Sequence, residues 1–109
     1  MPSETVASFG EVIAAERKRE KWSLRELAEK VINEDGAPVS PQYLNDIEHG
    51  RRIPADFVIE QLAKALHVPK DVLFHLAGRL APDIPSSKLA SRATIERAYQ
   101  AFRKSLKNP

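Results

Sequence analysis

The side chains of this 109-residue chain with the clearest capacity to recognise another molecule are Gln42, Asn45, Arg51 and Arg52. A glutamine or asparagine amide can make two hydrogen bonds to the edge of an adenine. Arginine is well suited to phosphate oxygens. From the residues alone, the two amides are either readers of DNA bases or ordinary polar side chains of an exposed helix.

Residues that would carry catalysis or hold a metal are sparse. The three histidines, His49, His67 and His75, stand far from one another in the sequence, and there is no cysteine. No glycine-rich phosphate loop, nucleophile elbow or zinc-protease motif occurs. We therefore expect neither an enzyme nor a metal or cofactor site.

The composition is that of an ordinary folded domain, with 42% hydrophobic and 29% charged residues. The absence of cysteine excludes disulfides. Apolar runs are short and no leader segment is visible, so no membrane association is expected. The expected location is the cytoplasm, in association with the nucleoid.

Charge is distributed unevenly along the chain, although the formal net charge is only +2. Residues 86–109 hold six basic residues and one acidic residue, a balance of 6 − 1 = +5, so the remainder carries 2 − 5 = −3. Such an asymmetry indicates either a nucleic-acid partner or a basic tail that packs on its own acidic body. The charge alone favours neither.

The hydrophobic pattern predicts helices throughout, because apolar residues recur at spacings of three and four. Ser23 with Glu26 forms a capping box, Ser40 followed by Pro41 is a helix start, and Gly50 is a helix stop. The helices expected after the first one cover residues 24–32, 41–49, 55–66, 69–77 and 89–106.

The helices expected at 24–32 and 41–49 resemble the helix-turn-helix of phage repressors, the Xre/Cro family. The first carries Ser-Leu-Arg-Glu-Leu-Ala-Glu-Lys-Val at 23–31, and the second carries Pro-Gln-Tyr-Leu-Asn-Asp-Ile-Glu-His-Gly-Arg-Arg at 41–52. The resemblance covers roughly residues 9–78. It implies an all-α fold: a compact five-helix, lambda-repressor-like domain followed by a C-terminal amphipathic helix.

The resemblance also implies roles for individual residues, because the second helix of this motif enters the major groove of DNA. The implied base contacts are Gln42, Tyr43 and Asn45. The implied phosphate contacts are Arg25, Ser40, Arg51 and Arg52. Asp46 is a poorer candidate, since a carboxylate near DNA needs a cytosine amino group or a basic partner.

Two further features concern the structure of the motif. In the family an arginine at the position of Arg17 pairs with a glutamate at the position of Glu48, so we expect a partly buried structural ion pair. Residues 32–38 form an insertion where the family has a tight turn. The insertion must lengthen the preceding helix, bulge as a loop, or both, and we expect its acidic tip to lie away from DNA phosphates.

The domain organisation expected is a DNA-binding domain at 5–80, a linker at 81–87 and an amphipathic helix at 88–107. The apolar stripe of the last helix needs a partner. We expect it to form a homodimer, although docking on its own domain or on another protein is also open. The stripe consists of Ile95, Tyr99, Phe102 and Leu106.

Two functions are therefore compared. The first is a sequence-specific transcriptional regulator, expected to be a repressor, that binds double-stranded DNA. The alternative is a protein-interaction module of the same fold, an antitoxin-like protein or an adaptor, that binds its partner through the C-terminal helix.

Overall fold

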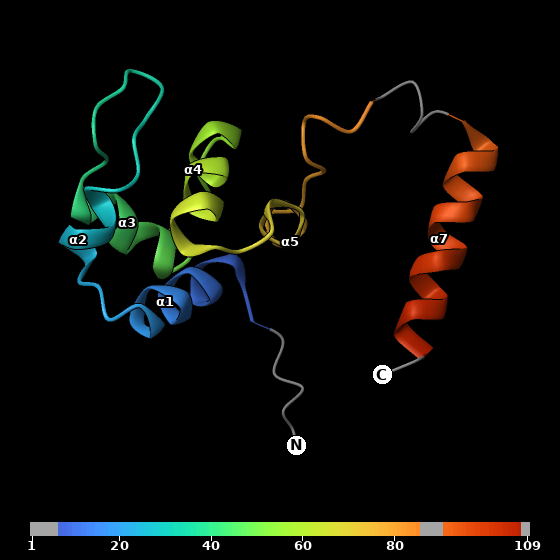
Figure 1. The fold of residues 1–109 in the computed structure, drawn as a ribbon, viewed down its shortest axis with the longest axis horizontal. Helices are drawn as coiled ribbons and strands as arrows, with labels where there is room; N and C mark the ends of the chain where they lie inside the picture. The colour runs from blue at the N-terminus through green and yellow to red at the C-terminus, as the bar shows by residue number, and fades with distance from the viewer. Residues whose placement is uncertain (1–6, 86–90, 108–109) are drawn as a thin grey trace.

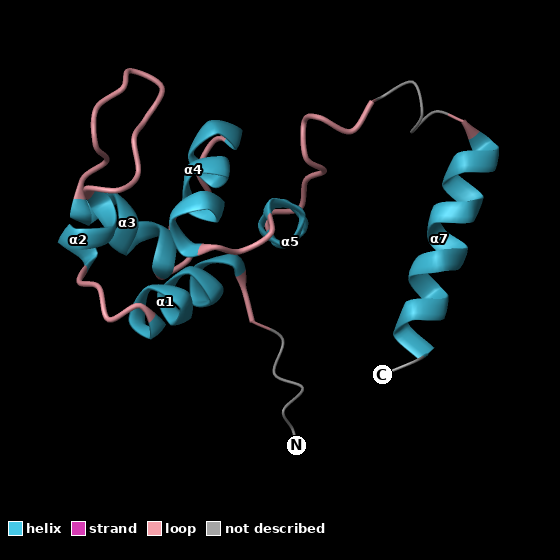
Figure 2. Ribbon diagram, in the orientation of Figure 1, coloured by secondary structure: helices cyan, strands magenta, loops and turns pink. Residues whose placement is uncertain are grey.

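The described part of the chain, residues 7–85 and 91–107 of a computed structural model, contains α-helices and no β-strand (Figures 1 and 2). This confirms the all-α class. The helices in chain order are α1 Phe9–Arg19, α2 Leu24–Ala28, α3 Pro41–Glu48, α4 Asp56–Leu66, α5 Lys70–Leu76 and α7 Arg92–Lys107.

Serine side chains begin the first three helices. Ser8 and Ser23 each form a capping box, with Glu11 and Glu26 respectively, in which the serine oxygen accepts from the glutamate amide and the glutamate carboxylate accepts from the serine amide. The capping box predicted at Ser23 is confirmed. The hydrogen bond from the Ser8 amide also lowers the pKa of Glu11.

The second helix is shorter than expected, because α2 ends at Ala28 and not at Ile32. Beyond α2 the chain pairs with itself: the Val39 amide donates to the Val31 carbonyl oxygen at 2.9 Å, and Ile32 forms an antiparallel bridge with Pro38. Backbone groups used in this pairing cannot also extend a helix. The expected helix boundary was therefore wrong.

The insertion at 32–38 bulges as a loop and does not lengthen α2. The side-chain oxygen of Asn33 accepts from the amides of Asp35 and Ala37, at 2.9 and 3.1 Å, and thus organises the loop from inside. Gly36 has a φ of +84°, a backbone conformation that residues other than glycine rarely adopt. The loop projects from the body beside α2 and α3 (Figure 1).

A single hydrophobic cluster joins the first five helices. Its fully buried side chains come from α1, α2, α3, α4 and α5, so each helix contributes its apolar stripe. The largest of them are Phe74, Ile13, Leu27, Leu44, Ile47, Ile59, Leu62, Leu66 and Leu73. This cluster fixes α3 between α1 and α2, which leaves its opposite face exposed.

The α1–α3 contact depends on Gly10, which is buried. A methyl group at this position would overlap the backbone carbonyl oxygens of Ile47 and Glu48. Only a residue without a side chain therefore allows α1 to approach the C-terminal end of α3 this closely.

The segment after α5 lies against the domain. Ala81 is buried and Ile84 packs on the hydrophobic cluster, while Arg79 donates to the Pro54 carbonyl oxygen and to Asp56, at 2.9 and 2.8 Å. The boundary between domain and linker remains a prediction, and part of the predicted linker, 86–87, lies outside the described residues. Helix α7 follows, and none of its described side chains is buried.

Candidate nucleic-acid interface

The candidate interface centres on the N-terminal turn of α3. Ser40 caps this helix, since its hydroxyl oxygen accepts from the Tyr43 amide at 3.0 Å, and Pro41 occupies the first helical position. Leu44 and Ile47 anchor the inner side of α3 in the core. The helix therefore presents a polar outer face.

Gln42 lies on that outer face and is exposed. Its Nε2 donates to Asp46 Oδ1 at 3.0 Å, and Arg51 Nε donates to the same oxygen at 3.2 Å. Asp46 thus has the basic partner that a carboxylate near DNA requires. The structure brings together a candidate base reader and a candidate phosphate ligand through one carboxylate.

The turn after α3 explains how Arg51 reaches Asp46. Gly50 adopts a φ of +75°, its amide donates to the Ile47 carbonyl oxygen, and the Arg51 amide donates to the Asp46 carbonyl oxygen. This pair of hydrogen bonds is the Schellman ending of a helix. It turns the chain back so that Arg51 and Asp46 are adjacent.

Tyr43 and Arg52 form a second pair on the flank of α3. The Arg52 guanidinium lies over the Tyr43 ring, 5.0 Å from its centre. Partial burial of the ring raises the pKa of the Tyr43 hydroxyl, and the Arg52 charge opposes that rise. The ring also lines a shallow pocket with residues of the insertion loop and α4, so Tyr43 is less exposed than Gln42.

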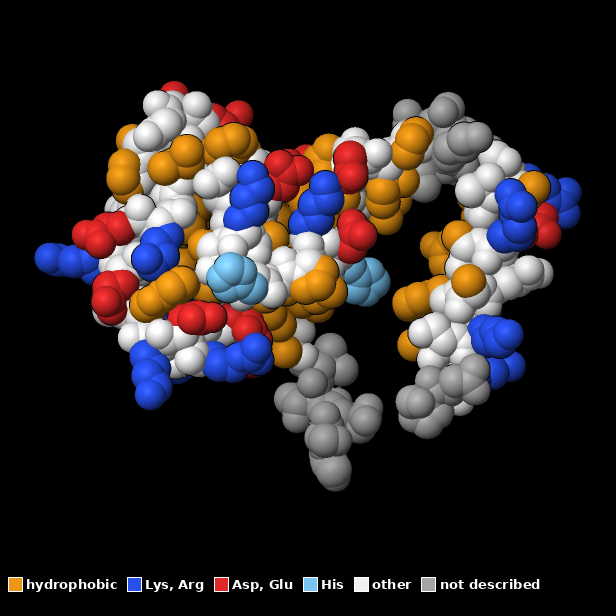
Figure 3. Space-filling model, in the orientation of Figure 1, with side chains coloured by type: hydrophobic (Ala, Val, Ile, Leu, Met, Phe, Trp, Pro, Cys, Tyr) orange, Lys and Arg blue, Asp and Glu red, His pale blue; other side chains and the backbone are white. Residues whose placement is uncertain are grey.

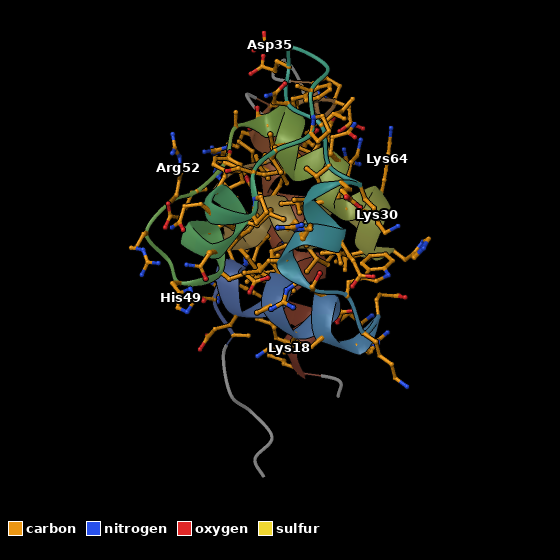
Figure 4. All side chains as sticks on the ribbon, turned by 90° about the vertical axis from the view of Figure 1, so that its left-hand side faces the viewer. Lys18, Lys30, Asp35, His49, Arg52 and Lys64 are labelled. Atoms are coloured by element: carbon orange, nitrogen blue, oxygen red, sulfur yellow. The ribbon has the colours of Figure 1, made fainter. Side chains whose placement is uncertain are left out.

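Asn45 is half-buried, and its side chain makes no hydrogen bond to the described residues. Its backbone carbonyl oxygen lies 2.8 Å from Nδ1 of His49, which is exposed one turn further along. Figure 4 shows His49 and Arg52 on the α3 side of the domain. The hydrogen-bonding groups of the Asn45 amide therefore remain for a ligand.

Two further candidate phosphate ligands lie near the starts of α2 and α3. Arg25, in the first turn of α2, is exposed, and its side chain makes no hydrogen bond or ion pair with the described residues. The hydroxyl oxygen of Ser40 accepts the capping hydrogen bond, so its O–H remains able to donate outward. Both could bond phosphate oxygens beside the groove.

The ion pair expected between Arg17 and Glu48 is bidentate. Arg17 Nε and Nη2 donate to the two carboxylate oxygens of Glu48, at 2.7 and 3.0 Å, and Nη1 donates to the Trp22 carbonyl oxygen at 2.7 Å. The hydrogen bond with Glu48 raises the pKa of Arg17. This group ties the last residue of α3 to α1 and to the turn before α2.

The tip of the insertion loop is acidic, because Glu34 and Asp35 are both exposed there. Figure 4 places Asp35 at the far end of the loop and Lys64 on the side opposite Arg52. Phosphate would be repelled by the tip and attracted by the arginines that follow α3. The position of the loop relative to bound DNA remains a prediction.

Helix α7 carries the apolar stripe expected from the sequence. Its exposed members are Ile95, Tyr99, Phe102 and Leu106. Figure 3 shows hydrophobic side chains on the side of α7 that faces the body and most of its Lys and Arg on the other side. Ile95, Tyr99 and Phe102 line an open groove together with His75 and Leu80 of the body.

Neither the two hydrogen bonds that Asp46 accepts nor the close helix contact at Gly10 was expected from the sequence. The signals for Asp46 were its four-residue spacing from Gln42, which places the two on one helix face, and the glycine stop before Arg51. No local signal marked Gly10, because its neighbour belongs to a distant helix. Among the described residues, no group of three or more His, Asp or Glu could hold a metal ion.

Comparison with known proteins identifies the family to which the chain belongs. The model of the helix-turn-helix family matches residues 13–73. The chain is a member of this family, of the Xre-like type, as the resemblance predicted. The family consists of non-enzymatic DNA-binding regulators.

Relatives in Mycobacterium tuberculosis support this assignment. An uncharacterized HTH-type transcriptional regulator is 40% identical over 73 residues, which are 67% of this chain and 48% of that protein. The transcriptional regulator ClgR is 33% identical over 94 residues, which are 80% of this chain and 78% of that protein. This chain therefore spans about half the length of the first relative.

No solved structure matches the chain. Within the described residues, no helix is both long and apolar enough to cross a bilayer.

Proposed function

We propose that this protein is a sequence-specific DNA-binding transcriptional regulator that reads the major groove with α3. The observation that carries the proposal is the exposed Gln42 amide on the first turn of a braced helix, held beside Arg51 through Asp46. Residues at this end of the second helix of a helix-turn-helix are those that reach the bases. Gln42, Tyr43 and Asn45 are the proposed base contacts.

The proposed phosphate contacts surround this turn. They are Arg25, Ser40, Arg51 and Arg52. Arg25 precedes the loop and Arg51 and Arg52 follow the helix, so the cations flank α3 in sequence on both sides. Such contacts fix the orientation of a protein on the duplex, whereas base contacts specify the sequence.

The regulator is further proposed to be a homodimeric repressor. Helix-turn-helix repressors bind paired half-sites about one helical turn apart, which requires two copies. The stripe of Ile95, Tyr99, Phe102 and Leu106 has spacings of four, three and four, which suit a helix pair. Such a regulator would act in the cytoplasm on the nucleoid.

A second candidate function is a protein-interaction module with α7 as its binding element. The exposed apolar stripe of α7 and the acidic tip of the insertion loop favour it. Exposed stripes of this kind often mark protein interfaces. In this case α3 would contact no DNA.

The test is binding to duplex DNA, with probes selected from a random library and measured by fluorescence anisotropy at several salt concentrations. Gln42→Ala should lower the preference for the selected duplex about tenfold, because one base contact is lost. Arg51→Ala should weaken binding to all duplexes and lower the salt slope by about one.

Lys64→Ala is the matched control, because Lys64 is an exposed cation on the side of the domain opposite Arg52 (Figure 4). It should leave both the preference and the salt slope nearly unchanged. If the unmodified protein enriches no DNA sequence from the library, the proposed DNA-binding function is overturned and the protein-interaction module is favoured.

A further inference from the structure

The carboxylate of Asp46 holds two groups of the proposed interface at once. Its Oδ1 accepts from Gln42 Nε2 at 3.0 Å and from Arg51 Nε at 3.2 Å, and its side chain is 27% exposed. Gln42 and Asp46 share one face of α3, and the helix ending at Gly50 returns Arg51 to that face. The positions of Gln42, Asp46 and Arg51 are therefore set by α3 and by the turn that ends it at Gly50.

The hydrogen bond to Asp46 changes what Gln42 can offer to a base. A free glutamine amide has two N–H donors and one acceptor oxygen, and it can rotate. Asp46 accepts only an N–H, so it fixes which end of the amide is nitrogen and occupies one of the two donors. One donor and the acceptor oxygen remain for the ligand.

This remaining pattern matches adenine and not guanine. In the major groove, adenine presents the N7 acceptor beside the N6 amino donor, whereas guanine presents two acceptors, N7 and O6. An amide with one free donor and one acceptor bonds both groups of adenine. Against guanine it would leave the amide oxygen facing another acceptor, which is unfavourable.

Arg51 completes the arrangement in two ways. Its charge balances the Asp46 carboxylate, which would otherwise be repelled by DNA. Its Nε serves Asp46, and its Nη groups make no hydrogen bond to the described residues, so they can bond a phosphate. A phosphate bound there would hold Arg51, and through it Asp46, in place.

We propose that Asp46 is a specificity-determining positioning residue, which orients the Gln42 amide so that it selects adenine over guanine at one base pair. This inference rests on the proposed function. Asp46 acts through Gln42 and makes no base contact of its own.

The test begins with selection of random DNA duplexes by the unmodified protein. Anisotropy titrations then use duplexes that differ at one base pair at a time, and Gln42→Ala identifies the base pair that Gln42 reads. The unmodified protein should prefer adenine there. Asp46→Ala should reduce the adenine-over-guanine ratio at that base pair about tenfold and leave the other positions unchanged.

Two further variants separate the hydrogen bond from charge and from folding. Asp46→Asn removes the charge but keeps an oxygen that Arg51 and Gln42 can both approach, so most of the preference should remain. Asp46→Leu lacks any acceptor and should behave as Asp46→Ala, and circular dichroism melting checks that each variant is folded. In a Gln42→Ala background, Asp46→Ala should have no further effect on the ratio.

The outcomes distinguish this inference from the proposed function. If no sequence is selected, the proposed function fails and this inference fails with it. If a sequence is selected but guanine is preferred, or Asp46→Ala leaves the ratio unchanged or alters every position equally, only the role of Asp46 is overturned.

Discussion

Arg17 connects three parts of the domain through one guanidinium group. It bonds both carboxylate oxygens of Glu48 at the end of α3 and the Trp22 carbonyl oxygen in the turn before α2. The Arg17 and Glu48 side chains are only 12% and 5% exposed. A charge so enclosed is costly when its partner is missing, so this pair constrains the position of α3.

Arg17→Ala should lower the free energy of unfolding by about 3 kcal/mol, because the Glu48 carboxylate would remain enclosed without its partner. Urea unfolding followed by circular dichroism measures the change. Replacing both residues, as Arg17→Met with Glu48→Leu, should recover part of the loss. A change below about 0.5 kcal/mol in Arg17→Ala would show that the pair does not constrain the fold.

At the scale of elements, the crossing of α1 and α3 determines how α3 is held in the domain. The two helices approach at Gly10, where the carbonyl oxygens of Ile47 and Glu48 occupy the space that a side chain would need. Backbone atoms cannot move aside as a flexible side chain can. The position of α3 therefore depends on a residue that lies far from the candidate interface in sequence.

Gly10→Ala should destabilise the domain by about 3 kcal/mol, although alanine favours a helix over glycine by about 1 kcal/mol. Thermal or urea unfolding provides the measurement. Ala15→Gly, at an exposed position of the same helix, is the control and should cost only about 1 kcal/mol. A stabilised Gly10→Ala protein would contradict the close approach of the two helices.

At the scale of the whole molecule, α7 is joined to a domain whose core it does not share. None of its described residues is buried, whereas the cluster formed by the first five helices is closed. An i to i+4 pair, Arg92 Nε to Glu96 Oε1 at 2.7 Å, supports the helix locally. The apolar stripe remains exposed, although Ile95, Tyr99 and Phe102 line the groove with His75 and Leu80, and a second copy is its proposed partner.

Phe102→Asp should weaken dimerisation at least about tenfold, because it places a charge in the apolar contact between two α7 helices. Sedimentation velocity over a range of concentrations measures the effect. Gln100→Asp adds the same charge outside the stripe and should leave the dimer intact. Both variants should melt at the temperature of the unmodified protein, and a monomeric unmodified protein would contradict the dimer.

The starts of the helices could be predicted because their signals are local. A capping box such as Ser23 with Glu26 forms hydrogen bonds within one turn, and Pro41 after Ser40 fixes the backbone at the start of a helix. Both signals can therefore be recognised without the rest of the chain. The end of α2 could not be predicted in this way. It depends on Val31 pairing with Val39 across the loop, which competes with continuation of the helix.

The sequence by itself determined the helical class, the caps and the family, because hydrophobic spacing and capping act over a few residues. It also supplied the candidate readers, since their chemistry resides in single side chains. Only the tertiary structure decided that Asp46 joins Gln42 to Arg51 and that α1 meets α3 at Gly10. These contacts depend on the path of the chain through its turns and on how closely two backbones approach. Neither can be predicted from neighbouring residues in the sequence.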